Sequence, residues 1–221
     1  MIKAIIFDMD GVLIDSEPLH TKAVADVLRE MGYEPDEILK KYRVGARSYG
    51  KTWADIKEEL GLAMPLEEIT RRQFEYSYEM FEEVELFEIE GATQIIEKAK
   101  ELGFAVAVGS SAPVRLINII LRKLGMMDLI ETYCGVEYVK TPKPAPDIYE
   151  WVAKDLKLQP QECMVIEDSP TGIKSAKAAG MFAMGIMGSG YTREELAQAD
   201  IIVEDFEEAT KFICDEIRKD I

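Results

Sequence analysis

Two carboxylates, Asp8 and Asp10, end a short apolar segment near the start of the chain and are followed by Gly11. The apolar run at residues 4–7 predicts an inner strand of a parallel sheet. Ligands of open α/β folds bind at the carboxyl ends of such strands. Two adjacent carboxylates repel each other unless a cation lies between them or one takes a proton. The pair therefore indicates a metal site, an acid/base role, or both.

Two further polar groups follow later apolar runs. Ser110 and Ser111 come after the predicted strand at residues 104–108 and precede a helix with a proline near its first turn. Hydroxyls and backbone N–H groups in that place predict an anion cradle. Lys143 lies in a loop that three prolines stiffen, so it has little conformational freedom to lose when it pairs with a phosphate.

A second acidic pair, Glu167 and Asp168, directly follows the predicted strand at residues 163–166 and suits oxygen-liganded Mg2+. Each polar cluster has an ordinary structural explanation when it is taken alone. Serines commonly cap helices, a loop lysine is usually solvated, and an acidic pair before Ser-Pro can simply begin a helix. Four clusters at successive strand ends, combining acids, hydroxyls and a lysine, favour a single site.

A regular alternation of predicted strands and helices positions these clusters. Alternation of this kind favours a parallel sheet joined by right-handed crossovers. We therefore predict an α/β, Rossmann-like core with helices on both faces of the sheet. Strands are expected at residues 4–7, 104–108, 133–136, 163–166, 182–186 and 201–203, and helices at 92–102, 114–124, 147–156 and 171–179.

Residues 16–88 interrupt this alternation with a stretch that has no strand pattern and is rich in Glu, Arg, Tyr and Leu. Its first helix is expected to have Ser16 as its N-cap and to stop at Gly32. Later helices should be separated at Pro35, Gly45, Gly61 and Pro65. The prediction is an all-helical domain at 16–88, inserted into an α/β catalytic core formed by 1–15 and 89–221.

Composition limits which binding partners and which cellular compartment are expected. The 221 residues carry a formal net charge of −16, which argues against nucleic acid as a partner and requires local positive groups for any anionic substrate. Three widely spaced cysteines indicate reduced thiols and a cytoplasmic location. Neither a signal peptide nor an apolar run of membrane-spanning length is expected, so we predict no association with a membrane.

Together these motifs resemble, in order and spacing, the four motifs of the haloacid dehalogenase-like (HAD) hydrolase superfamily. The matching residues are Asp8-Met9-Asp10-Gly11, Ser110, Lys143-Pro144 and Glu167-Asp168. Segments 143–149 and 167–173 are similar to the phosphatase and β-phosphoglucomutase-like branch, and residues 16–88 resemble its helical cap. The resemblance covers the whole chain and implies a monomer.

The resemblance also implies a mechanism. Asp8 would attack phosphorus and form an aspartyl-phosphate, and Asp10 would protonate the leaving alcohol and then activate water. Mg2+ would be held by the Asp8 carboxylate, the Asp10 backbone carbonyl and Asp168. Glu167 would be a further metal ligand or an outer partner.

Within the same mechanism, Ser110, Ser111 and Lys143 would bind the phosphoryl oxygens, where negative charge must be stabilised. We expect a Mg2+-dependent phosphatase for a small phosphorylated metabolite, most simply a sugar phosphate. The alternatives are a β-phosphoglucomutase and a non-catalytic protein that binds phosphometabolites.

The choice of substrate is expected to depend on the helical domain. Glu17 and His20 follow the hinge, where Glu17 could bind a substrate hydroxyl and His20 could lie over the leaving group, and Arg47 or Lys51 could bind a second phosphate or a sugar. The ordinary explanations are an acid at a helix start for Glu17 and a polar residue on an amphipathic helix for His20. The mutase branch would place an arginine three residues after Gly45, where this chain has Ser48, and this difference weakens the mutase alternative.

Overall fold

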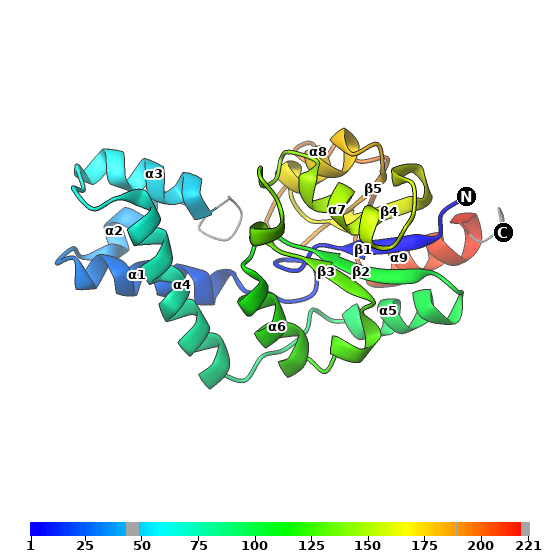
Figure 1. Ribbon diagram of the computed structural model, residues 1–221, viewed down its shortest axis with the longest axis horizontal. Helices are drawn as coiled ribbons and strands as arrows, with labels where there is room; N and C mark the ends of the chain where they lie inside the picture. Colours follow the sequence, from blue (N-terminus) through cyan, green and yellow to red (C-terminus); the bar gives the residue numbers. More distant parts are fainter. Residues whose placement is uncertain (43–48, 189, 218–221) are drawn as a thin grey trace. The chain divides into compact units, whose positions relative to one another are not determined.

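A six-stranded parallel sheet organises the α/β part of the chain in the computed structural model, which describes residues 1–42, 49–188 and 190–217 (Figure 1). The strand order β3-β2-β1-β4-β5-β6 is that of Rossmann-type folds, which confirms the predicted fold class. Every residue of β1 and β4 is buried, as expected for inner strands. The strands are β1 (Ala4–Phe7), β2 (Ala105–Gly109), β3 (Thr132–Cys134), β4 (Cys163–Glu167), β5 (Phe182–Ile186) and β6 (Ile201–Val203).

Helices cover both faces of this sheet, with α7 and α8 on one face and α5, α6 and α9 on the other (Figure 1). Their bounds are α5 (Ala92–Glu101), α6 (Val114–Lys123), α7 (Asp147–Asp155), α8 (Pro170–Ala178) and α9 (Phe206–Phe212). The sequence prediction omitted α9, which is short and continues into a π-helical turn at Ile213–Ile217. The predicted strand at 133–136 begins one residue earlier and ends at Cys134, because a 3-10 turn at Val136–Tyr138 follows.

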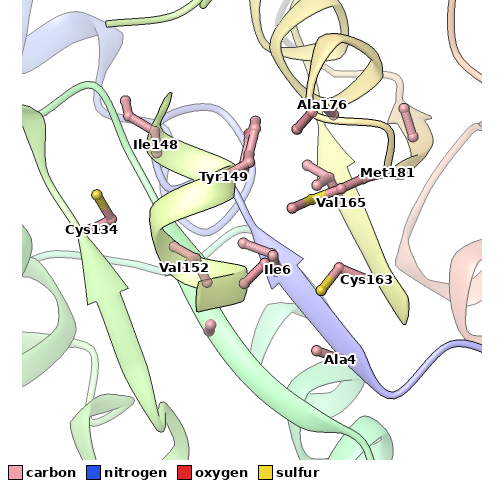
Figure 2. Packing of buried hydrophobic residues seen from close by; sticks show 14 of the residues in the cluster. Ala4, Ile6, Cys134, Ile148, Tyr149, Val152, Cys163, Val165, Ala176 and Met181 are labelled. Carbon is pink, nitrogen blue, oxygen red and sulfur yellow. The ribbon is translucent and has the colours of Figure 1, made fainter. Parts of the chain in front are cut away.

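A hydrophobic cluster fills the space between the sheet and the helices α7 and α8 (Figure 2). Cys134 and Cys163 are buried in it as free thiols, in agreement with the predicted reduced cysteines. A buried thiol packs there as a small apolar group. Tyr149 of α7 carries a phenol hydroxyl into the same cluster, and a buried hydroxyl needs a hydrogen-bond partner.

The chain divides by its internal contacts into an α/β unit, Met1–Asp15 with Phe87–Ile221, and a helical unit, Ser16–Leu86. The helical unit contains α1 (Glu17–Glu30), α2 (Pro35–Leu39), α3 (Tyr49–Leu60) and α4 (Leu66–Glu83). Its hydrophobic cluster includes Leu28, Trp53 and Ile69.

The predicted helix boundaries of the helical unit agree with most of its observed ones. Ser16 precedes α1, although its side chain makes no capping hydrogen bond. Gly32 follows α1 with φ of 85°, a left-handed conformation that favours glycine at a helix end. Gly45 lies outside the described residues. Among the helices that the structure describes, none has both the length and the apolar character needed to cross a membrane.

Candidate active site

The two predicted acidic pairs meet at the point where the strand order reverses. β1 and β4 are hydrogen-bonded neighbours with Phe7 opposite Ile166, and the Asp8 N–H donates to the Ile166 carbonyl at 3.0 Å. The residues that follow these two strands therefore lie beside each other. In open α/β sheets this reversal is where ligands bind, so the fold itself places Asp8 next to Glu167 and Asp168 in a candidate active site.

Lys143 joins the two acidic pairs through its side chain. Its Nζ donates to Asp8 Oδ1 at 2.6 Å and to Glu167 Oε1 at 2.7 Å, and all three residues are at least nine-tenths buried. The Gly109 carbonyl and the Tyr149 hydroxyl are further acceptors at 2.9 and 2.7 Å. The proline-rich loop thus places the ammonium group of Lys143 at the ends of β1, β2 and β4. We call Asp8, Lys143, Tyr149 and Glu167 the buried charge cluster.

Glu167 is held at both of its carboxylate oxygens. Oε1 accepts from Lys143 and from the Tyr149 hydroxyl, the latter at 2.8 Å. Oε2 accepts from the Ser169 backbone N–H at 3.1 Å and from its hydroxyl at 3.0 Å. A Cβ atom at Gly172 would lie 1.6 Å from Oε1, so the glycine makes room for this carboxylate. Glu167 is therefore fixed in place by residues that precede and follow it in the sequence.

Burial and neighbouring charges shift the pKa values of Asp8 and Lys143. The pKa of Asp8 is raised to about 8 because burial outweighs the opposing effect of Lys143 and because the charges of Glu167 and Asp10 add to the rise. For Lys143, burial favours the neutral amine, but the negative charges of Asp8 and Glu167 outweigh it and raise its pKa above the usual value. The lysine is consequently a permanent cation, whereas Asp8 favours its protonated form unless a further positive partner stabilises the carboxylate.

The acidic residues also form a candidate metal centre. Asp8, Glu167 and Asp168 each offer a carboxylate oxygen, and these oxygens lie within 4.8 Å of one another. Oxygen donors of this kind fit Mg2+. Both oxygens of Glu167 accept hydrogen bonds from neighbouring side chains or backbone, which favours an outer role for this carboxylate.

Ser110 brings the end of β2 to the same site. Its hydroxyl contacts Asp10 Oδ2 at 3.4 Å and accepts from the Ala112 N–H at 3.0 Å. Ser111 is half-buried in the same turn.

The predicted anion cradle at the start of α6 is partly filled by the chain itself. The Val114 N–H donates to the two carboxylate oxygens of Glu137 at 3.1 and 2.9 Å. The Ser110 and Ala112 N–H groups of the predicted cradle also donate within the chain, to the Cys134 carbonyl and to the Ser110 hydroxyl.

The residues predicted for substrate choice are not among those that the α/β unit brings together. Glu17 is half-buried in the first turn of α1. His20 is fully buried within the helical unit, with its ring centroid 5.2 Å from that of Phe81. Arg47 lies outside the described residues. Their proposed contacts with substrate remain predictions.

Sequence reasoning gave no role to Tyr149 or Gly172. Both lie in the segments that carry the family resemblance, but neither has a type and spacing that indicate chemistry. One signal was available in the sequence. Tyr149 has the apolar neighbours Ile148 and Val152, which indicates a buried ring, and a buried hydroxyl needs a polar partner.

Most of the chain is similar to known proteins. A family model described as haloacid dehalogenase-like hydrolase matches residues 2–180. The phosphorylated carbohydrates phosphatase of Thermotoga maritima is 32% identical over 180 residues, which cover 81% of this chain and 82% of that protein. The chloroplastic protein SUPPRESSOR OF QUENCHING 1 of Arabidopsis thaliana is 32% identical over 189 residues, which cover 84% of this chain but only 18% of that longer protein.

Among solved structures, a CbbY variant from Rhodobacter sphaeroides in complex with xylulose 1,5-bisphosphate is similar with a TM-score of 0.82. Its sequence is 26% identical, and the match covers 94% of this chain and 96% of that one. The proteins that resemble this chain thus include a phosphatase and a protein crystallised with a sugar bisphosphate.

Proposed function

The chain belongs to the haloacid dehalogenase-like hydrolase family, and we propose that it is a Mg2+-dependent phosphatase acting on a phosphorylated carbohydrate. One observation carries the proposal: Lys143 Nζ lies 2.6 Å from Asp8 Oδ1 inside a buried cluster at the ends of β1, β2 and β4. A nucleophile, a cation and a candidate metal centre therefore occupy one site, as transfer of a phosphoryl group requires.

Asp8 is the proposed nucleophile. Its carboxylate oxygen forms a bond to phosphorus while the bond from phosphorus to the substrate alcohol breaks, leaving an aspartyl-phosphate. Water then attacks this phosphorus, the bond to Asp8 breaks, and inorganic phosphate leaves. The buried contact with Lys143 holds Asp8 in one orientation, which lowers the entropy lost on reaching the transition state.

Asp10 is the proposed acid and base. It would give its proton to the departing alkoxide and then take a proton from the attacking water, so it returns to its starting state after each turnover. Its Oδ2 lies 3.4 Å from the Ser110 hydroxyl, which supports a fixed orientation for the carboxyl group.

Asp8, Asp168 and the Asp10 backbone carbonyl would hold Mg2+, with Glu167 as an outer partner that orients Lys143. When bound, the ion would offset the repulsion between the Asp8 carboxylate and the anionic substrate. Ser110, Ser111 and Lys143 would bind the phosphoryl oxygens. These local donors are needed because the chain as a whole has a charge of −16.

The proposal of a carbohydrate substrate rests on the relatives. One of them is a phosphorylated carbohydrates phosphatase, and one similar structure contains a sugar bisphosphate. The resemblance of segments 143–149 and 167–173 to the β-phosphoglucomutase-like branch favours phosphoryl transfer between sugar hydroxyls as the second candidate.

A phosphate-release screen over sugar phosphates, nucleotides and phosphoglycolate tests the proposal. We expect release from at least one sugar phosphate with Mg2+, loss of this activity with EDTA, and loss of at least about 10³-fold in Asp8→Asn. Activity that Asp8→Asn retains would exclude the proposed nucleophile. Release of phosphate from none of the substrates would favour a non-catalytic protein that binds phosphometabolites.

The mutase candidate requires a separate measurement. Glucose 1-phosphate is supplied together with a bisphosphate primer, and both glucose 6-phosphate and free phosphate are quantified. Formation of glucose 6-phosphate without free phosphate would replace the phosphatase assignment by the mutase.

A further inference from the structure

We propose that Tyr149 is a positioning residue whose hydroxyl accepts one N–H of Lys143 and supplies Glu167 with a hydrogen bond of its own, and so sets how the ammonium group is oriented toward Asp8. The inference rests on the proposed function for its effect on turnover, but the contacts behind it belong to the α/β unit alone.

The hydrogen-bond count around Lys143 leads to this assignment. Its ammonium group has three N–H donors, whereas the structure places four oxygens between 2.6 and 2.9 Å from Nζ. Ionised Asp8, ionised Glu167 and the Gly109 carbonyl can only accept hydrogen bonds. The Tyr149 hydroxyl is the one partner of these four that can both accept and donate.

Tyr149 supplies the fourth donor that these four acceptors need. It accepts one N–H from Lys143 at 2.7 Å and donates its own O–H to Glu167 Oε1 at 2.8 Å. The three N–H groups can then serve Asp8, Gly109 and Tyr149, while Glu167 accepts a hydrogen bond from the phenol O–H and stays paired with the ammonium charge at 2.7 Å. Without the hydroxyl, the N–H that Tyr149 accepts would turn to Glu167, so Asp8 and Glu167 would share the ammonium group directly.

The phenol is fixed in place by its packing. Tyr149 has no exposed surface and projects from α7 into the cluster that Figure 2 shows. A Cβ at Gly109 would lie 3.0 Å from its Cε1 atom, so the glycine admits the ring. Lys143 Nζ lies 4.6 Å from the ring centroid, where the π-face attracts a cation. Burial, followed by the charges of Glu167 and Asp8, raises the pKa of Tyr149 well above its usual value, so the hydroxyl keeps its proton.

Tyr149→Phe tests the inference because it removes the hydroxyl and keeps the ring. We expect kcat to fall about tenfold or more, because displacement of a reacting group by about 1 Å can slow turnover about 10²-fold. KM should change less than about twofold, since in this proposal Tyr149 contacts Lys143 and Glu167 rather than substrate.

Tyr133→Phe is the matched control. The Tyr133 hydroxyl of β3 donates to Asn118 Oδ1 at 2.9 Å, outside the buried charge cluster, so this variant also loses one phenol hydrogen bond. Both variants are assayed below their melting temperatures, and their folding is compared by circular dichroism. A purely structural role for Tyr149 would lower its melting temperature but leave kcat equal to that of Tyr133→Phe.

A second readout does not depend on turnover. The side-chain ammonium 15N signal of Lys143, assigned by its loss in Lys143→Met, should shift or broaden in Tyr149→Phe and stay unchanged in Tyr133→Phe. An unchanged signal in Tyr149→Phe, or a kcat within twofold of the control, overturns the inference. A wild-type protein that is inactive in the phosphate-release screen overturns the proposed function instead, and the ammonium signal then decides the inference alone.

Discussion

The buried charge cluster of the α/β unit and a surface charge cluster of the helical unit contain similar ion pairs with opposite consequences. In the surface charge cluster, formed by Glu30, Glu68, Arg71 and Arg72, Glu68 accepts from Arg71 at 2.9 Å. In the buried charge cluster, Asp8 accepts from Lys143 at 2.6 Å. Each carboxylate has a cationic partner, yet their pKa values move in opposite directions.

Burial accounts for this difference. Hydrogen bonds from Arg71 and then Arg72 lower the pKa of Glu68 to about 2, because water still solvates the ionised carboxylate. Asp8 is removed from water, and burial raises its pKa to about 8 although Lys143 is adjacent. The Lys143 and Asp8 side chains are 5% and 10% exposed, against 57% and 34% for Arg71 and Glu68. Exposure to water therefore decides whether a carboxylate beside a cation has a lowered or a raised pKa.

Surface and buried ion pairs also differ in what they contribute to the stability of the fold. Surface ion pairs are screened by water and salt and contribute little to folding. Buried charges carry a desolvation penalty that a well-packed apolar core would avoid. A chain that retains Asp8, Lys143 and Glu167 inside its core therefore keeps charges where the proposed chemistry needs them.

The largest expected effect comes from removing the central cation. Lys143→Met leaves Asp8 and Glu167 buried without their shared partner, and breaking such a pair typically destabilises a protein by roughly 3–5 kcal/mol. Urea unfolding monitored by circular dichroism measures this change. Arg71→Met is the matched substitution at the surface and should leave the unfolding midpoint unchanged within error. Equal effects of the two substitutions would show that burial does not distinguish the clusters.

A smaller effect is expected from pH, with opposite signs for the two clusters. The pKa of Asp8 is raised from 3.8 to about 8 in the folded protein. A raised pKa adds stability that is complete below about pH 4 and is lost as the pH rises through about 8. In Mg2+-free buffer, the stability of wild type relative to Asp8→Asn should therefore fall between these pH values. Added Mg2+ should reduce this fall, because a cation favours the ionised carboxylate. A stability difference between wild type and Asp8→Asn that does not change with pH would contradict the raised pKa of Asp8.

The smallest effect is expected at Glu68. Its pKa is lowered from 4.5 to about 2, so its contribution is present above about pH 4.5 and is lost as the pH falls toward 2. Glu68→Gln should therefore be slightly less stable than wild type near neutrality and equal to it at low pH. Raising the salt concentration should also narrow the gap, because these side chains are exposed. If the stability difference between wild type and Glu68→Gln persists at high salt, Glu68 behaves like a buried group, which contradicts the prediction.

Local patterns predicted much of the fold. Apolar runs flanked by glycine, proline and polar residues indicated β1, β5 and β6 with the observed bounds, and the other strands within one or two residues. The short helix α9 was missed because its few turns give a weak periodic signal. The order of strands across the sheet was not predicted, since it depends on pairings between distant segments.

Residue types alone were enough to identify the groups that could do chemistry, because acids, hydroxyls and a lysine follow successive predicted strands. How those groups act on one another depends on the folded structure. Lys143 meets Asp8 across 135 residues of sequence, and Tyr149 completes the cluster from a helix that otherwise contributes to the apolar core. Solvation and hydrogen-bond geometry depend on the packing of all these segments at once, and no local pattern in the chain encodes them.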